Sequence, residues 1–168
     1  LAGLAGLAGC TGGGQGGTET AVPAAQIGMV YATGGLDDGS FNDQAQQGLQ
    51  RAEEELAVVS DRTQPSEVSE FANFQQQFAQ STSPNYDLVC CIGFLQADAL
   101  SQTAESHPDQ QFMIVDEVVD ADNVASYTFE EQEGSYLAWM LAGLISTSDF
   151  SAGGGSSGGN GNVGFVGG

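Results

Sequence analysis

The chain has 168 residues, of which 22 are acidic and only two, Arg51 and Arg62, are basic, so its formal net charge is -20. Nucleic-acid binding requires lysine or arginine to neutralise phosphates, and attraction to an anionic membrane surface requires a basic cluster, so this composition excludes both. At molar salt the screening length falls to roughly 3 Å, which largely removes repulsion between acidic groups. We therefore interpret the charge as a solvated acidic surface of a halophilic protein.

The first 25 residues predict an export and anchoring segment. Residues 1–10, LAGLAGLAGC, have the pattern of a truncated signal peptide that ends in a lipobox, with Cys10 as the lipid anchor. A plain signal peptide with a chance cysteine is the alternative. Residues 11–25 are rich in glycine and threonine and predict a flexible tether with a reach of roughly 20 Å. This arrangement predicts a protein held at the outer face of the plasma membrane.

Apolar strands and amphipathic helices alternate through the middle of the chain. The expected strands are residues 26–32, 57–60, 87–92, 111–115 and 124–128. The expected helices begin at Ser40, after Pro65 and at Gln96, and Ser40 with Asp43 matches a capping box. Repeated β-α units with apolar strands predict an α/β fold with a parallel, doubly wound, Rossmann-like sheet, in which ligands bind beyond the carboxyl ends of the strands.

A second capping-box pattern, Thr128 with Glu131, precedes a helix expected at residues 130–146. We expect this helix to be mostly buried, because it carries Leu137, Met140, Leu141, Leu144 and Ile145. Residues 151–162 are rich in glycine and serine and predict a mobile loop before a final strand in GNVGFVGG. Because that strand pattern runs to the last residue, we expect the sequence to be truncated at its C-terminus.

The loop after the first expected strand, TGGLDDGSFND, carries candidate ligand-binding residues. Its spacing matches no phosphate-binding motif, and Asp37 and Asp38 would repel a phosphate. These carboxylates and Asn42 can hydrogen-bond to hydroxyls, amides or ring nitrogens, and Phe41 offers a flat face for stacking. The alternative is that both aspartates complement the helix dipole and that Phe41 fills the core.

Two further strand ends carry candidates. Gly93 follows the third expected strand and allows close approach of the backbone to a ligand, and Phe94 lies beside it. Asp98, in the same loop, is interpreted as a charge at the start of a helix. Asp116 follows the fourth expected strand directly, where a carboxylate can bind two vicinal hydroxyls.

The reactive residue types favour binding over catalysis. Cys90 and Cys91 lie in an apolar run, where cysteine behaves as a small hydrophobe, although a vicinal disulfide or a metal pair remains an alternative. With His107 as the only histidine and no CxxC motif, we expect neither a zinc site nor a catalytic triad. A phosphoacceptor domain would need an aspartate at the end of the third strand and a lysine, which the sequence lacks. We expect no enzyme activity, metal or cofactor.

Several segments in the right order resemble the basic membrane protein family, the purine-nucleoside-receptor-like substrate-binding lipoproteins of ABC transporters. They are LDDGSFND, DLVCCIGFLQADAL, MIVDEVVDADNVASYTFEEQEGSYLAWMLAGL and VGFVGG. The resemblance implies a type I periplasmic-binding-protein fold, in which two lobes close on a ligand. Residues 26–128 would form the first lobe and residues 129–168 the incomplete start of the second.

The same resemblance implies a ligand site and a role. Phe41 would stack on a nucleoside base, Asp116 would lie near the ribose hydroxyls, and the edge of the base would be bound by Asp37, Asp38 and Asn42. It leaves open which of the two neighbouring aspartates contacts the ligand. The implied function is capture of a nucleoside, with a purine favoured, for a membrane permease driven by an ATPase subunit. A surface lipoprotein that only senses its ligand, or a binding protein for another polar molecule such as a sugar, is the alternative.

Overall fold

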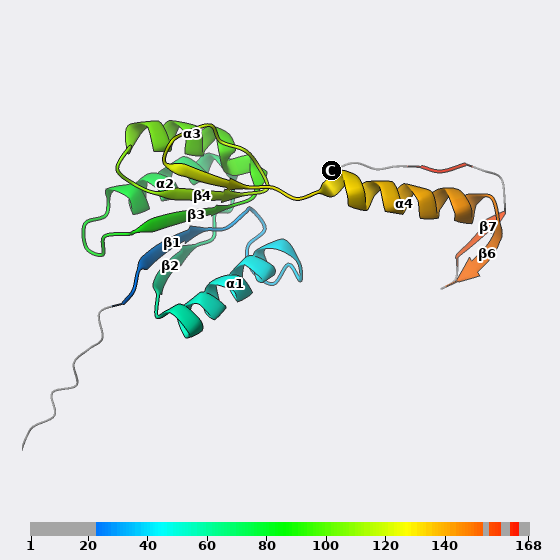
Figure 1. Cartoon of the computed structure of the whole chain (residues 1–168), viewed down its shortest axis with the longest axis horizontal. Helices are drawn as coiled ribbons and strands as arrows, with labels where there is room; N and C mark the ends of the chain where they lie inside the picture. Colours follow the sequence, from blue (N-terminus) through cyan, green and yellow to red (C-terminus); the bar gives the residue numbers. More distant parts are fainter. Residues whose placement is uncertain (1–22, 153–154, 159–161, 165–168) are drawn as a thin grey trace, which may run out of the picture.

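The computed structural model describes residues 23–152, 155–158 and 162–164, and it contains a parallel sheet with helices on both faces (Figure 1). The five strands are β1 (Gln26–Val30), β2 (Val59–Thr63), β3 (Leu88–Ile92), β4 (Phe112–Val115) and β5 (Val124–Tyr127). They pair in the order β2-β1-β3-β4-β5, and every pairing is parallel. This order confirms the doubly wound sheet. The expected signal peptide, Cys10 and most of the tether lie outside the described residues.

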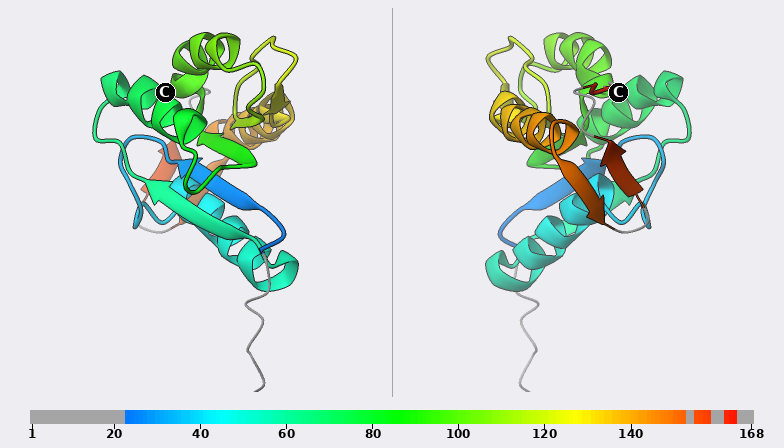
Figure 2. Two further views of the ribbon diagram at one scale, coloured as in Figure 1. Left: turned by 90° about the vertical axis from the view of Figure 1, so that its left-hand side faces the viewer. Right: turned by 90° about the vertical axis from the view of Figure 1, so that its right-hand side faces the viewer.

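Helices connect the strands as the sequence pattern predicts. They are α1 (Phe41–Leu56), α2 (Phe71–Gln80), α3 (Ala97–Ser106) and α4 (Glu131–Ser146). Two short 3-10 turns, η1 (Val68–Glu70) and η2 (Phe94–Gln96), lead into α2 and α3. Figure 2 shows α1 on one face of the sheet and α2 with α3 on the other. The lobe is therefore a three-layer sandwich whose strand ends point toward α4.

Each face of the sheet has its own hydrophobic core. The core beneath α1 contains Met29, Tyr31, Leu49, Cys90 and Ile92, whereas the core beneath α2 and α3 includes Val30, Phe71, Val89, Cys91, Leu100 and Ile114. Successive side chains along a strand point to opposite faces, so the adjacent cysteines belong to different cores. Both cysteines are free thiols, and burial raises the pKa of Cys90 to about 12. They act as small apolar side chains, as expected.

The expected position of the second strand is wrong. It was expected at residues 57–60, but β2 begins at Val59 and ends at Thr63. Ala57 ends α1 in a left-handed conformation with φ of 54°, so it belongs to the turn between helix and strand. The strand continues through the polar residues Asp61 and Arg62 because β2 lies at the edge of the sheet and pairs with β1 alone. An edge strand with polar residues gives little hydrophobic signal.

The expected capping boxes are also wrong. The Ser40 side chain makes no capping hydrogen bond; instead, the Asp38 carboxylate accepts the backbone N–H groups of Ser40 at 2.7 Å and Asn42 at 3.0 Å. At α4 the N-cap residue is Glu130, and no side chain caps this end, so Thr128 does not act as predicted. The loop before α1 brings the Asp38 carboxylate to the amides of Ser40 and Asn42, so Asp38 acts as the side-chain cap that was predicted for Ser40.

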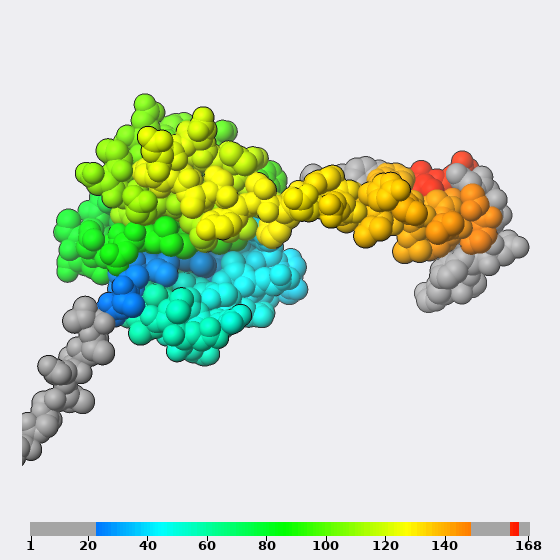
Figure 3. All heavy atoms as spheres, viewed as in Figure 1, coloured from blue at the N-terminus to red at the C-terminus, as the bar shows by residue number. Residues whose placement is uncertain are grey.

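The expectation that α4 is mostly buried is wrong as well. This helix projects away from the lobe (Figures 1 and 3), and Leu137 and Leu144 are each 65% exposed. It packs against a hairpin of β6 (Asp149–Ala152) and β7 (Gly155–Gly158) instead of against the lobe's sheet. The hairpin occupies part of the expected mobile loop. Residues 162–164 form no strand, and residues 165–168 lie outside the described part.

Candidate ligand-binding site

A hollow of about 250 Å³ lies where the carboxyl ends of β1, β3 and β4 meet. It is lined by Ala32, Phe41, Phe71, Ile92, Gly93, Phe94, Leu95 and Asp116. Four of the predicted site residues are therefore brought together from three separate loops. A doubly wound sheet opens a crevice at this point because the chain after β1 crosses to one face and the chain after β3 crosses to the other.

Gly93 and Asp116 occupy equivalent positions, each one residue beyond its strand. The Gly93 N–H donates to Val115 O at 3.0 Å, and the Asp116 N–H donates to Tyr127 O at 2.7 Å. Both residues have positive φ, 104° at Gly93 and 81° at Asp116. Glycine adopts this conformation freely, but an aspartate is strained there by on the order of 1 kcal/mol. The strain at Asp116 favours a role for its carboxylate.

Carboxylates dominate the charge at the hollow. Burial raises the pKa of Asp116, and the nearby carboxylate of Glu131, which shares a hydrogen bond with it, raises the pKa further. The two arginines of the sequence pair with glutamates of α1, Arg51 with Glu55 at 2.7 Å and Arg62 with Glu53 at 2.5 Å. The hollow therefore disfavours an anion and favours a neutral or cationic ligand that donates hydrogen bonds.

Three other predicted residues do not line the hollow: Asp37 and Asp38 lie in the loop before α1, and Asn42 is the second residue of α1. The Asn42 side chain is buried and serves its own loop: its Oδ1 accepts the Ala32 N–H at 3.0 Å, and its Nδ2 donates to Gly35 O at 2.9 Å. Asp38 caps α1, and those backbone hydrogen bonds hold its pKa below the usual value. Asp37 is exposed, with φ of 69°. A ligand contact by any of the three stays a prediction.

The sequence analysis did not identify Phe129. This residue lies between β5 and α4, is 55% exposed, and packs edge-to-face on Phe41 with ring centroids 6.5 Å apart. Glu131, which approaches Asp116, was considered only as a capping residue. The sequence contains one indication that Phe129 and Glu131 belong to the site: both follow the end of a predicted strand, as the other site residues do. Only the fold shows that the β5 end lies close enough to contact Phe41 and Asp116.

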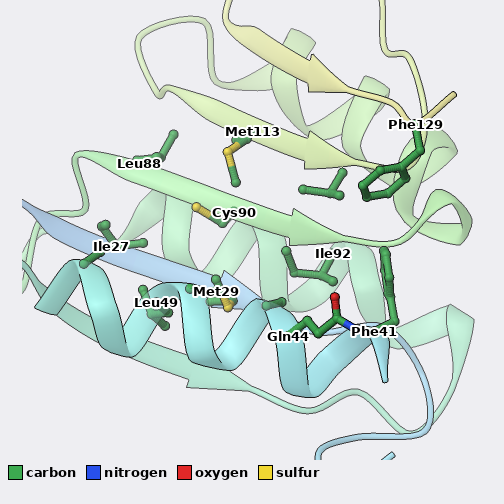
Figure 4. Close-up of a pocket in the computed structure, with 14 residues that line it drawn as sticks. Ile27, Met29, Phe41, Gln44, Leu49, Leu88, Cys90, Ile92, Met113 and Phe129 are labelled. Carbon is green, nitrogen blue, oxygen red and sulfur yellow. The ribbon is translucent and has the colours of Figure 1, made fainter. Parts of the chain in front are cut away.

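A second hollow of about 370 Å³ lies between α1 and the sheet (Figure 4). It is lined mainly by apolar side chains, among them Ile27, Met29, Leu49, Leu88, Met113 and Val115, and Phe41 with Phe129 forms one end. Gln44 is the only lining residue with an amide or charged side chain. The hollow at the strand ends is the better candidate because it contains the Asp116 carboxylate and lies beyond the carboxyl ends of the strands, where doubly wound sheets bind their ligands.

Two further properties bear on the kind of site. Within residues 23–152, 155–158 and 162–164, no group of His, Cys, Asp and Glu side chains is arranged to hold a metal ion. No helix in the described part is both long and apolar enough to cross a bilayer.

The fold and the position of the site agree with comparisons to known proteins. The profile of one family, described as ABC transporter substrate-binding protein PnrA-like, matches residues 25–162. An uncharacterized lipoprotein of Pyrococcus furiosus is 34% identical over 76% of this chain and 32% of its own length. The ABC transporter nucleoside-binding protein BmpA of Lactococcus lactis is 34% identical over 77% of this chain and 37% of its own length.

A solved structure agrees with these sequence matches. A solute-binding protein of an ABC transporter system from Aeropyrum pernix K1 superimposes with a TM-score of 0.66 at 33% identity, covering 73% of this chain and 33% of that chain. The chain thus spans about a third of the length of the proteins it matches. These relatives are named as binding proteins or lipoproteins rather than as enzymes. The chain belongs to the PnrA-like family of ABC transporter substrate-binding proteins, also called the basic membrane protein family.

Proposed function

We propose that the protein captures a nucleoside, with a purine as the favoured base, for an ABC importer. The observation that carries this proposal is that Phe41 and Asp116, from different loops, line the same hollow. An aromatic face suits a planar base, and a carboxylate suits the two vicinal hydroxyls of a ribose. The name of the Lactococcus lactis relative as a nucleoside-binding protein supports the same ligand class.

The charge of the site favours a nucleoside over a nucleotide. Asp116, Glu117 and Glu131 are all carboxylates, and the hollow has no lysine or arginine among its lining residues. A phosphate group would meet like charge there, whereas hydroxyl and amino groups would meet hydrogen-bond acceptors. Residues 26–128 would supply one side of the site, and a second lobe that begins at residue 129 and includes α4 would close on the other side.

The same proposal includes the protein's location and partners. A lipid on Cys10 would hold the protein at the outer face of the plasma membrane, with residues 11–25 as the tether. The Pyrococcus furiosus relative, which is named a lipoprotein, supports this anchor. The closed, loaded protein would deliver its ligand to a permease whose transport is driven by an ATPase subunit. The protein itself would perform no chemistry.

Titration calorimetry of the full-length protein in high salt tests the ligand. We expect binding of purine nucleosides and much weaker binding of the corresponding monophosphates and of free sugars. Phe41→Ala and Asp116→Ala are each expected to weaken binding roughly tenfold or more, because each removes one of the two recognition elements. Asp122→Ala is the matched control, since Asp122 is an exposed carboxylate in the loop after β4 that does not line the hollow. Absence of binding to every nucleoside would refute the proposal.

A further inference from the structure

A buried hydrogen-bond network lies directly beneath the hollow at the strand ends. It is formed by the side chains of Gln75 on α2, Gln96 at the end of η2 and Thr103 on α3, and all three residues have no exposed surface. The surrounding core is apolar, so a fully bonded polar network at this depth defines one arrangement of the elements that it joins. None of the sequence patterns identified these residues.

One end of the network joins two strands. The Gln96 Nε2 group donates to Val30 O and to Ile92 O, both at 2.9 Å. Val30 and Ile92 are the last residues of β1 and β3, the two neighbouring strands whose chains then leave toward opposite faces. A single amide group therefore bridges the two strand ends just beyond the last pair of the β1–β3 ladder, Val30 with Cys91, at the point where the crevice opens.

The other end of the network fixes the orientation of that amide. The Gln96 Oε1 atom accepts a hydrogen bond from Gln75 Nε2 at 3.2 Å, and Gln75 Oε1 accepts one from Thr103 Oγ1 at 3.3 Å. A flipped Gln96 amide would place its oxygen against two carbonyl oxygens and its NH₂ group against the Gln75 donor. The bonded orientation is thus the one in which Gln96 donates to both strands.

Gln96 is also coupled to the turn that lines the hollow. Its backbone N–H donates to Gly93 O at 3.2 Å, which closes the turn formed by Gly93, Phe94 and Leu95. On the β1 side, Ala32 lines the same hollow two residues beyond Val30. Gln96 therefore connects the two walls of the hollow through their backbones.

We infer that Gln96 is a positioning residue for ligand capture, which fixes the separation between the loop after β1 and the turn after β3. This inference rests on the proposed function, because it assigns Gln96 a role in affinity without contact with the ligand. Gln75 supports Gln96 from the core and shares a side-chain hydrogen bond with Cys91 of β3, but, unlike Gln96, it does not bridge β1 and β3 through their last carbonyl groups. The two glutamines therefore make a matched pair for a test.

The test compares Gln96→Met with Gln75→Met in the full-length protein. Methionine is similar in length and fills the space without a donor, so each variant leaves one buried amide of the network without its partner. We expect both to be destabilised, and Gln96→Met to bind the nucleoside roughly tenfold or more weakly than Gln75→Met at a temperature where both are folded. The reason is that Gln96 can still donate to Val30 O and Ile92 O when Gln75 is replaced. Equal losses of affinity in the two variants, or wild-type affinity in Gln96→Met, would overturn the inference.

Hydrogen exchange in the absence of ligand provides a second measurement. In the wild type, the Gly93 and Gln96 amides should exchange as slowly as amides of β3, and Gln96→Met should accelerate them more than Gln75→Met does. If the Gly93 and Gln96 amides of the wild type exchange as fast as amides in exposed loops, the inference is overturned, even if Gln96→Met fails to fold. If the wild type binds no nucleoside, the proposed function fails, and the exchange data alone then decide whether Gln96 orders the turn.

Discussion

Helices α1 and α4 are both 16 residues long, and both follow a sequence pattern that predicts a capped, amphipathic helix. In the structure, α1 lies on the sheet with Leu49 only 4% exposed, whereas α4 extends from the lobe with Leu144 65% exposed. The apolar pattern of a helix therefore predicts that one face is apolar, but it does not predict which part of the protein packs against that face. For α1 the partner is the sheet of the same lobe.

A pair of identical substitutions tests this difference and should give the largest effect. Leu49→Ala removes a side chain from the core beneath α1, so we expect the free energy of unfolding of the 168-residue chain to fall by about 2–5 kcal/mol. Leu144→Ala removes an exposed side chain, and its expected effect is within about 0.5 kcal/mol. Urea denaturation of both variants provides the measurement. Equal losses would show that α4 packs on the lobe in solution.

Asp116 lies in the lobe directly after β4 and interacts with Glu131 of α4, and its substitution tests whether local backbone strain is maintained for binding. Asp116→Gly relieves the positive φ, and Asp116→Ala does not, so the glycine variant should be more stable than the alanine variant by about 1 kcal/mol. Both variants remove the carboxylate and should lose nucleoside affinity to the same extent. Thermal unfolding and calorimetry measure the two properties separately. If Asp116→Gly retained full affinity, the carboxylate would have no role in binding.

Acid should lower the stability of the fold through the N-terminus of α1 but not through that of α4, and we expect this effect to be smaller than the two above. Backbone hydrogen bonds lower the pKa of Asp38 below its ordinary value of 3.8. Ionised Asp38 therefore stabilises the fold above pH 3.8, and this contribution is lost as the pH falls through the lowered pKa of the folded state. Asp38→Asn should reduce the free energy of unfolding at neutral pH. It should also make that free energy fall less steeply as the pH is lowered, as measured by chemical denaturation at several pH values.

Two substitutions serve as controls for that experiment. Ser40→Ala and Thr128→Ala remove the side chains that the sequence pattern assigns as caps, but neither caps its helix in the structure. Both should leave the stability and its pH dependence unchanged. A loss of stability in Ser40→Ala comparable to that in Asp38→Asn would show that the serine caps α1 in solution.

Much of the lobe can be predicted from the sequence because its central strands are continuous apolar runs. The bounds of β3 and β4 are predicted to within one residue, whereas β2 is displaced because an edge strand has exposed polar residues. The site residues at strand ends, Gly93 and Asp116, follow from the topology once the strands are known. Their position in the same hollow as Phe41 follows from the same rule.

The remaining features depend on geometry that no local pattern encodes. Asp38 caps α1 only because the preceding loop turns back on itself, and Gln96 reaches two strands only because the sheet order places them side by side. Phe129 lies far along the chain from Phe41, and their contact arises from the position of β5 beside β4. Short-range patterns identify elements, and the sheet order decides which distant side chains meet.

The loop before α1 is held in place by hydrogen bonds within the lobe itself. Asn42 bonds to the backbone at Ala32 and Gly35, while Asp43 accepts the backbone N–H groups of Asp37 and Gly39 at 2.8 Å and 2.9 Å. A ligand that binds beside this loop would contact a backbone that is already fixed, so the loop would lose little conformational entropy on binding. Under the proposed function, the conformational adjustment that accompanies capture would then fall mainly on the second lobe.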